Sequence, residues 1–313
     1  MSSDQPQNWI SSVQRPRDFD VFWQSNLDQT TQIDLDVEMT YLNARSTDQV
    51  DVFDIRYTSY GGLRIAAWYC KPKGPGPFPG LIHLPGYVSE PTLPKSIASA
   101  GYAVVGVAPR GKLRSNEVFN PGYPGLLTYG INSRDSYGYL GFYMDAVRAF
   151  DMLEGFPEVD SSRLGVRGDS QGGALTLLVA ALRNEKVHAA AAGAPYLCSM
   201  MDAASLTQSY PYQEINDYLR VHPEERKVVR DCLNYFDIHN FADRIRSPIV
   251  VNLGLKDDVC PPETGFALFN QIGSDEKYLY TYENCAHDAG QFVGQAKITN
   301  DFLAKHLSPE AIQ

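Results

Sequence analysis

One short segment carries residue types suited to nucleophilic chemistry. Gly168-Asp-Ser-Gln-Gly172 has the pattern Gly-x-Ser-x-Gly, and it lies between a strand predicted at 163–167 and a helix predicted at 174–182. A serine on such a sharp turn takes a strained backbone, so its neighbours must be small to allow close approach. The turn would expose the Ser170 hydroxyl as a nucleophile and aim the Gln171 N–H at a substrate. A loop serine before a helix cap is the alternative; the flanking strand and helix favour the nucleophile.

A nucleophilic serine needs a general base, and the base needs an acid that orients it. After this type of turn, the acid and then the histidine follow in the chain, each behind a later strand. His287 comes just after the strand predicted at 277–282 and is therefore the expected base. His239 precedes the penultimate strand and His306 lies in the closing helix, so neither fits. No metal-ligand spacing joins the remaining histidines, His83, His188 and His222.

Two neighbouring aspartates are candidates for the acid. Asp257 and Asp258 both follow the strand predicted at 248–253, and the pattern alone does not separate them. A solvated turn or helix cap before the proline pair 261–262 is the competing interpretation of both. Asp288 is too close to the histidine in sequence to be the expected orienting acid.

Acyl transfer also requires N–H donors for the oxyanion. Besides the amide of Gln171, a second donor is expected from the loop after an early strand. The chain reads Leu84-Pro-Gly-Tyr87 at that point, so the N–H of Tyr87 is the candidate, and we expect Tyr87 to contact the substrate. A plain Pro-Gly turn is the alternative that the sequence leaves open.

The rest of the chain alternates between predicted strands and helices. A helix bearing Phe19 comes first, followed by a polar connection that runs to about residue 43 and then by a hairpin turned at Gly61-Gly62. Later strands are predicted at 80–84, 102–108, 163–167, 187–192, 248–253 and 277–282, and later helices at 94–100, 136–154, 174–182, 262–271 and 291–306. This alternation predicts an α/β fold with a mostly parallel central sheet and helices on both faces. We expect one domain over residues 1–313, interrupted by a loop at 110–134 and by an insertion at 195–240 that caps the site.

Composition excludes several classes of partner. The 313 residues carry a net charge of −10, from 27 basic and 37 acidic side chains without a basic run, so nucleic acid is not an expected partner. No stretch approaches the roughly 20 apolar residues needed to span a bilayer, and the polar start at 1–14 lacks the apolar stretch of a signal peptide. Five scattered cysteines are typical of a reducing compartment rather than of a disulfide framework. We therefore expect a cytoplasmic protein.

At these residues the chain resembles the acetyl xylan esterase / cephalosporin C deacetylase family, carbohydrate esterase family seven, of the α/β-hydrolase superfamily. The resemblance covers nearly the whole chain. It rests on Arg15-Pro-Arg-Asp-Phe-Asp-Val-Phe-Trp23, on Asp135-Ser-Tyr137 with Tyr143-Met-Asp-Ala-Val-Arg-Ala149, on Arg163 to Gly173, and on Gly254-Leu-Lys-Asp-Asp-Val-Cys-Pro-Pro262. The last motif resembles the family's Gly-Leu-x-Asp-x-x-x-Pro-Pro and places the acid at Asp257.

The resemblance implies a function as well as a fold. It implies an α/β-hydrolase that deacetylates small acetylated sugars or xylo-oligosaccharides without a metal or cofactor. It also implies a cytosolic homo-oligomer, often a hexamer whose active sites face an internal cavity.

Three positions depart from the family's pattern. Lys112 stands where the family has the glutamine of Arg-Gly-Gln, Pro85 stands where it has the histidine of His-Gly-Tyr, and Asp288 replaces a common glutamate. The backbone N–H of Tyr87 survives any such change, so we expect catalysis to be retained. The sequence leaves the acyl and alcohol pockets undefined.

Other functions fit the same segments. A peptidase or amidase of the same fold and a carboxylesterase for longer acyl chains are the enzyme alternatives. A non-catalytic binding protein is another, and the triplet Arg167-Gly-Asp169 could suggest adhesion. We interpret that triplet as the approach to the Ser170 turn, where it would not be free for a receptor.

Overall fold

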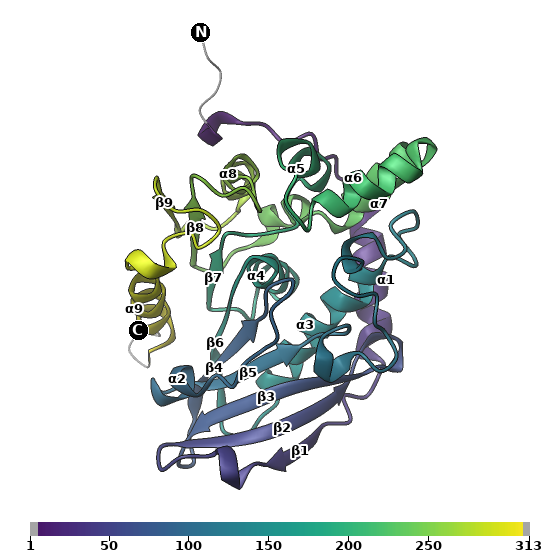
Figure 1. Ribbon diagram of the computed structural model, residues 1–313. Coiled ribbons are helices and arrows are strands. Elements are labelled where there is room, and N and C mark those ends of the chain that lie inside the picture. The colour runs from purple at the N-terminus through teal and green to yellow at the C-terminus, as the bar shows by residue number, and fades with distance from the viewer. Residues whose placement is uncertain (1–5, 309–313) are drawn as a thin grey trace.

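A computed structural model describes residues 6–308. Within this range nine strands form one sheet in the order β1-β2-β3-β5-β4-β6-β7-β8-β9 (Figure 1). The first three strands are antiparallel to their neighbours, and the other six run parallel to one another. The strands are β1 (Glu38–Tyr41), β2 (Val50–Thr58), β3 (Arg64–Pro72), β4 (Phe78–Leu84), β5 (Ala103–Ala108), β6 (Val159–Asp169), β7 (Ala189–Gly193), β8 (Ile249–Gly254) and β9 (Lys277–Tyr282).

Helices cover both faces of this sheet. α2 and α9 pack on one face, α3 and α4 pack on the other, and α1 lies outside α3 (Figure 1). The helices are α1 (Phe19–Thr31), α2 (Lys95–Ser99), α3 (Gly138–Glu154), α4 (Gln171–Leu182), α5 (Met200–Leu206), α6 (Gln213–Val221), α7 (Arg226–Phe236), α8 (Pro262–Gln271) and α9 (Gln295–Leu307). The predicted α/β class, with a mostly parallel sheet between helices, is confirmed.

The two-sided burial of the parallel strands explains their composition. Successive side chains of a strand point to opposite faces, so both of two neighbours must be apolar when helices cover both faces. In β4, Leu81 belongs to the smaller core cluster, which includes residues of α2 and α9, whereas Ile82 belongs to the larger cluster, which includes residues of α3 and α4. β7 is buried at every position, and it consists of four alanines and a glycine.

Most predicted elements are confirmed, with shifts of a few residues at their ends. The hairpin is an antiparallel pair of β2 and β3, and its turn uses the positive φ of Gly61 (70°) and Gly62 (76°). One prediction was wrong, because the polar connection expected after α1 contains β1. All four residues of β1 are exposed at the edge of the sheet, so the strand has no buried face that would give it an apolar pattern.

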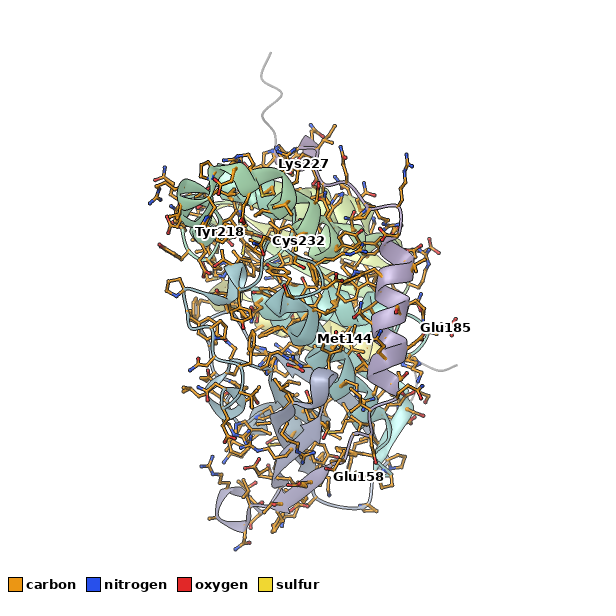
Figure 2. The ribbon with its side chains drawn as sticks, turned by 90° about the vertical axis from the view of Figure 1, so that its right-hand side faces the viewer. Met144, Glu158, Glu185, Tyr218, Lys227 and Cys232 are labelled. Atoms are coloured by element: carbon orange, nitrogen blue, oxygen red, sulfur yellow. The ribbon has the colours of Figure 1, made fainter. Side chains whose placement is uncertain are left out.

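The connection from β7 to β8 contains the segment 195–240, with α5, α6 and α7. These helices lie at one end of the molecule, where Figure 2 labels Tyr218, Lys227 and Cys232, while Glu158 lies at the opposite end. The inner side of α7 is buried and its outer side is exposed. The segment is therefore packed on the body of the protein by an apolar face.

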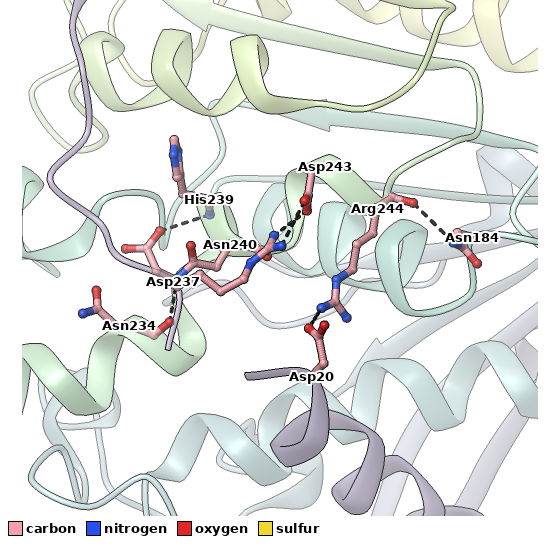
Figure 3. A network of polar contacts seen from close by, with 9 residues as sticks. Asp20, Asn184, Asn234, Asp237, His239, Asn240, Asp243 and Arg244 are labelled. Atoms are coloured by element: carbon pink, nitrogen blue, oxygen red, sulfur yellow. Dashed lines mark hydrogen bonds and ion pairs between the residues drawn. The ribbon is translucent and has the colours of Figure 1, made fainter. Parts of the chain in front are cut away.

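A polar network joins the N-terminal segment to residues 234–244 (Figure 3). Arg15 donates to both Asp243 (3.0 Å) and the carbonyl of Asn240 (2.5 Å), and Arg244 forms an ion pair with Asp20 of α1. Exposed ion pairs of this kind contribute about 1 kcal/mol or less each. The fully buried ring of Trp23 packs against Tyr143 of α3 and Phe236 of α7. Burial of this large aromatic side chain stabilises the position of α1 more than the exposed ion pairs do. No helix in residues 6–308 combines the length and the apolarity that a bilayer crossing requires.

Candidate active site

Ser170 lies at the sharp turn between β6 and α4. Its backbone has φ 58° and ψ −119°, a conformation that costs energy for a residue with a side chain. Three hydrogen bonds hold it there. Its N–H donates to the carbonyl of Gly193 (2.8 Å), and its own carbonyl accepts from Ala174 (3.0 Å) and Tyr196 (3.1 Å). The strained turn is therefore fixed by β7 and the residues just after it, and by α4, the helix that begins at Gln171.

The glycines around Ser170 are required by close backbone contacts. A Cβ at Gly172 would lie 2.2 Å from the carbonyl oxygen of Leu84, and a Cβ at Gly168 would lie 2.6 Å from the backbone of Gly172. Both distances are far inside van der Waals contact, so a larger residue at Gly172 would push α4 away from β4, and one at Gly168 would push α4 away from β6. The glycine pattern thus follows from the packing of the turn.

Asp257 and His287 meet at the ends of β8 and β9. Their atoms Oδ2 and Nδ1 are 2.8 Å apart. The other oxygen of Asp257 accepts from the amides of Val259 (2.9 Å) and Cys260 (2.8 Å), and the residue is only 6% exposed. A buried carboxylate held by two amides presents its free oxygen to the imidazole in one fixed orientation.

The competing acidic residues point elsewhere. Asp258 accepts from the hydroxyl of Ser209 (3.2 Å), and Asp288 accepts from the amide of Ala286 (3.1 Å). Of the aspartates considered from the sequence, the structure thus brings Asp257 to His287.

Main-chain hydrogen bonds connect the loops that carry these groups. The amide of Lys256 donates to the carbonyl of Cys285 (3.0 Å), which links the loop after β8 to the loop after β9. Gln291 donates to the carboxylate of Asp169 (2.8 Å) and so links the His287 loop to the Ser170 turn. Burial raises the pKa of Asp169. The carboxyl ends of parallel strands thus bring the three predicted groups to one edge of the sheet.

Ser170 and His287 line a common cavity of about 690 Å³. Its other walls come from residues 83–92, 123–124, Val259 and part of the segment 195–240. Tyr210, Pro211 and Glu214 are the contributions of that last segment. Apolar and aromatic walls with a few polar groups are typical of sites for small molecules.

Of the two predicted oxyanion donors, Tyr87 lines the cavity and Gln171 is the first residue of α4. Within residues 6–308, neither the amide of Tyr87 nor that of Gln171 donates to an acceptor of the protein. The side chains of both residues are held. The Tyr87 hydroxyl donates to Glu214 (2.6 Å), and the Gln171 side chain accepts from the hydroxyl of Tyr139 (2.7 Å). Neither amide is thus occupied by another group of the described residues, and of the two residues Tyr87 is the one in the cavity wall.

Two buried charged residues contact the loop that carries Tyr87. Glu214, which also accepts from the amide of Gly125 (2.8 Å), was missed in the sequence because its partners are 127 and 89 residues away. Lys112 stood out as a departure from a motif, but its contacts had no sequence signal. Its ammonium donates to the carbonyls of Gly86 (2.8 Å) and Tyr87 (2.5 Å). Burial raises the pKa of Glu214 and lowers that of Lys112 to about 8.

One group among residues 6–308 has side chains spaced to hold a cation. It consists of His222, Glu224 and Glu225, whose ligand atoms lie within 4.8 Å of one another. The group lies between α6 and α7, and none of its members lines the cavity. Exposed acidic groups of this kind are common without a metal. Because none of the three residues lines the cavity, the group is not part of the site that contains Ser170.

Comparisons with known proteins identify the family of this chain. The family model described as acetyl xylan esterase (AXE1) matches residues 1–306. An acetyl xylan esterase from Paenibacillus sp. R4 superposes with a TM-score of 0.90 at 31% identity, covering 98% of this chain and 100% of that one. Acetyl xylan esterase 1 from Thermoanaerobacterium sp. JW/SL YS485 gives 0.89 at 30% identity, covering 98% and 99%.

A longer relative is also similar. Acetyl esterase Axe7A of Xylanibacter ruminicola is 29% identical over 281 residues, which cover 86% of this chain. The matched region spans 63% of that relative's own length.

Proposed function

The chain belongs to the acetyl xylan esterase family, a family of carboxylic ester hydrolases, and from that premise we propose that it removes acetyl groups from small acetylated carbohydrates. One observation carries the proposal. His287 is paired with the buried Asp257 at 2.8 Å and lines the same cavity as Ser170, whose backbone is held in the strained conformation of a nucleophile. In this proposal Ser170 is the nucleophile, His287 the general base and Asp257 the orienting acid.

The first half of the reaction transfers the acetyl group to the enzyme. His287 takes the proton of the Ser170 hydroxyl as its oxygen attacks the acetyl carbonyl. The amides of Tyr87 and Gln171 stabilise the oxyanion of the tetrahedral intermediate, by about 3 kcal/mol per donor. The intermediate collapses when His287 returns the proton to the departing sugar oxygen, which leaves acetyl-Ser170 and a free sugar hydroxyl.

The second half restores the enzyme. His287 takes a proton from water, whose oxygen attacks the acetyl carbonyl, and the same two amides hold the second oxyanion. Collapse returns the proton to Ser170 and releases acetate. Asp257 holds the imidazole in the required tautomer and stabilises its charged form in both halves.

The composition of the cavity supports a carbohydrate as the alcohol. Tyr87, Tyr123 and Tyr210 give it aromatic walls, and Ser89 and Glu90 are polar groups able to bind hydroxyls. Tyr87 is the residue that we propose to contact the substrate directly.

The remaining features of the proposal concern the whole protein. We propose one α/β-hydrolase domain in which the segment 195–240 caps the site, supported by Tyr210 and Glu214 in the cavity wall. We propose a homohexamer, supported by the family and by exposed apolar side chains such as Phe292 (89% exposed). A cytoplasmic location is supported by five free thiols. Light scattering that gives a monomer would contradict the hexamer.

The proposal is tested by hydrolysis of 4-nitrophenyl esters of increasing acyl length, with Ser170→Ala as the control. We expect a steep preference for acetate and a loss of about 10⁴-fold or more in the variant. Acetylated xylose and cephalosporin C then test the alcohol side. A preference for longer chains would contradict acetyl specificity, and faster turnover of a peptide 4-nitroanilide would favour an amidase of the same fold. Substantial activity in Ser170→Ala would contradict the assigned nucleophile.

A further inference from the structure

Lys112 is a buried cation directly behind the proposed oxyanion site. It lies in the turn after β5, where its amide donates to the carbonyl of Pro109 (3.0 Å), and its exposed fraction is 0%. Its side chain crosses to the loop after β4, and the ammonium donates to the carbonyls of Gly86 (2.8 Å) and Tyr87 (2.5 Å). Burying a lysine costs free energy unless its charge is used. Here two backbone carbonyls accept hydrogen bonds from the charged ammonium.

One of these carbonyls shares a peptide group with the proposed donor. The C=O of Gly86 and the N–H of Tyr87 are the two ends of a single planar peptide unit. A cation at the oxygen end polarises the unit and makes the N–H end a stronger donor, because hydrogen bonds in a chain strengthen one another in a low-dielectric interior. The side-chain amide of Gln171 lies at the same oxygen, at 3.5 Å. The ammonium therefore acts on the peptide group whose N–H belongs to Tyr87, a residue of the cavity wall.

We propose that Lys112 is a positioning residue for the oxyanion site, whose ammonium orients and polarises the Gly86–Tyr87 peptide so that the Tyr87 N–H binds the developing oxyanion of the acetyl ester more strongly. This inference rests on the proposed function, since it assigns a role in the same reaction. Both halves of the reaction pass through an oxyanion, so the effect falls on kcat whichever half limits turnover. Binding of the neutral ester in the ground state does not use it.

The surroundings of Lys112 determine its pKa and therefore the pH range in which its ammonium can raise kcat. Glu90, from the loop after β4, is the acid whose charge favours the ammonium, and the ring of Tyr123 lies 4.7 Å from Nζ. The hydroxyl of Tyr87 is directed to Glu214 instead. Burial outweighs Glu90 and lowers the pKa of Lys112 to about 8. The ammonium is thus present below that pH and is lost as the pH rises through it, so kcat falls there.

The test compares Lys112→Gln with the parent protein. Glutamine keeps a neutral donor but removes the charge. With 4-nitrophenyl acetate we expect kcat to fall about tenfold, KM to stay within about twofold, and the decline of kcat above about pH 8 to disappear. Lys95→Gln is the matched control, because Lys95 also donates to a backbone carbonyl, that of Arg45 (3.3 Å), but lies outside the cavity wall. Its kcat, KM and pH profile should equal those of the parent.

The outcomes separate this inference from the proposed function. An unchanged kcat and pH profile in Lys112→Gln, or a loss confined to KM, would overturn the role of Lys112 while leaving the proposed nucleophile in place. Should Lys112→Gln fail to fold by circular dichroism, the pH profile of the parent decides. A kcat that stays level from about pH 7 to 10 would then overturn the inference. Activity retained in Ser170→Ala would instead overturn the proposed function itself.

Discussion

The two sides of the cavity are positioned by different kinds of contact. On one side, the groups Ser170, Asp257 and His287 follow the ends of parallel strands, and backbone hydrogen bonds such as that from Lys256 to Cys285 fix their loops. On the other side, the loop that carries Tyr87 is held by the side chains of Lys112 and Glu214. The first side is determined by the sheet, and the second by two buried charges.

This difference predicts how each side responds to substitution. A backbone-positioned group keeps its place when its own side chain is changed, so the loss is chemical and large. A loop held by buried side chains shifts when one of them is changed, so the loss is smaller and is accompanied by reduced stability. Paired substitutions on the two sides test this division.

The largest effect is expected on the side of the catalytic groups. Asp257→Asn keeps the shape of the residue but cannot hold the required imidazole tautomer, so kcat should fall about 10⁴-fold while the fold is retained. Steady-state kinetics and thermal unfolding measure the two quantities. The neighbouring Asp258→Asn is the matched control, since Asp258 is bonded to Ser209 rather than to His287. Equal losses in both variants would contradict the assignment of the acid.

A smaller effect is expected on the side of the Tyr87 loop. Glu214→Gln cannot accept from both the Tyr87 hydroxyl and the Gly125 amide, so one buried donor loses its partner. We expect the free energy of unfolding to fall by about 1–3 kcal/mol and kcat/KM to fall about tenfold, because the Tyr87 amide is displaced. Denaturant unfolding and initial rates check this.

An exposed carboxylate of the same segment serves as the control for that variant. Within residues 6–308, Glu224 pairs weakly with His222, at 3.8 Å. Glu224→Gln should leave both stability and kinetics unchanged. If Glu214→Gln behaves in the same way, the loop is not held by Glu214 and the division between the two sides fails.

The sequence allowed the first side of the site to be predicted. Strand ends, the Gly-x-Ser-x-Gly turn and the order of acid and histidine are local signals, and they predict Ser170 as the nucleophile and His287 as the base. The residues alone left Asp257 and Asp258 equivalent, and only the resemblance to a family chose between them. The hydrogen bond of 2.8 Å to His287 now distinguishes them.

The second side could not be predicted, for a physical reason. The partners of Glu214 are 127 and 89 residues away in the chain, and those of Lys112 are 26 and 25 residues away, beyond α2 and β5. The periodic spacing of apolar residues predicts helices and strands, but it does not predict side-chain contacts between residues so far apart in the chain. The strand β1 was missed for a related reason, because it pairs through its backbone at an exposed edge and needs no apolar side chains.

The central claim, that Ser170 is the activated nucleophile of this cavity, is tested most directly by titration with diethyl 4-nitrophenyl phosphate. The account predicts the release of one equivalent of 4-nitrophenol per active site, a loss of esterase activity in step with it, and a diethyl phosphoryl adduct on the peptide that contains Ser170. Asp257→Asn should be labelled far more slowly, because the imidazole is no longer oriented. An adduct on another residue, or esterase activity that survives full labelling, would contradict the account.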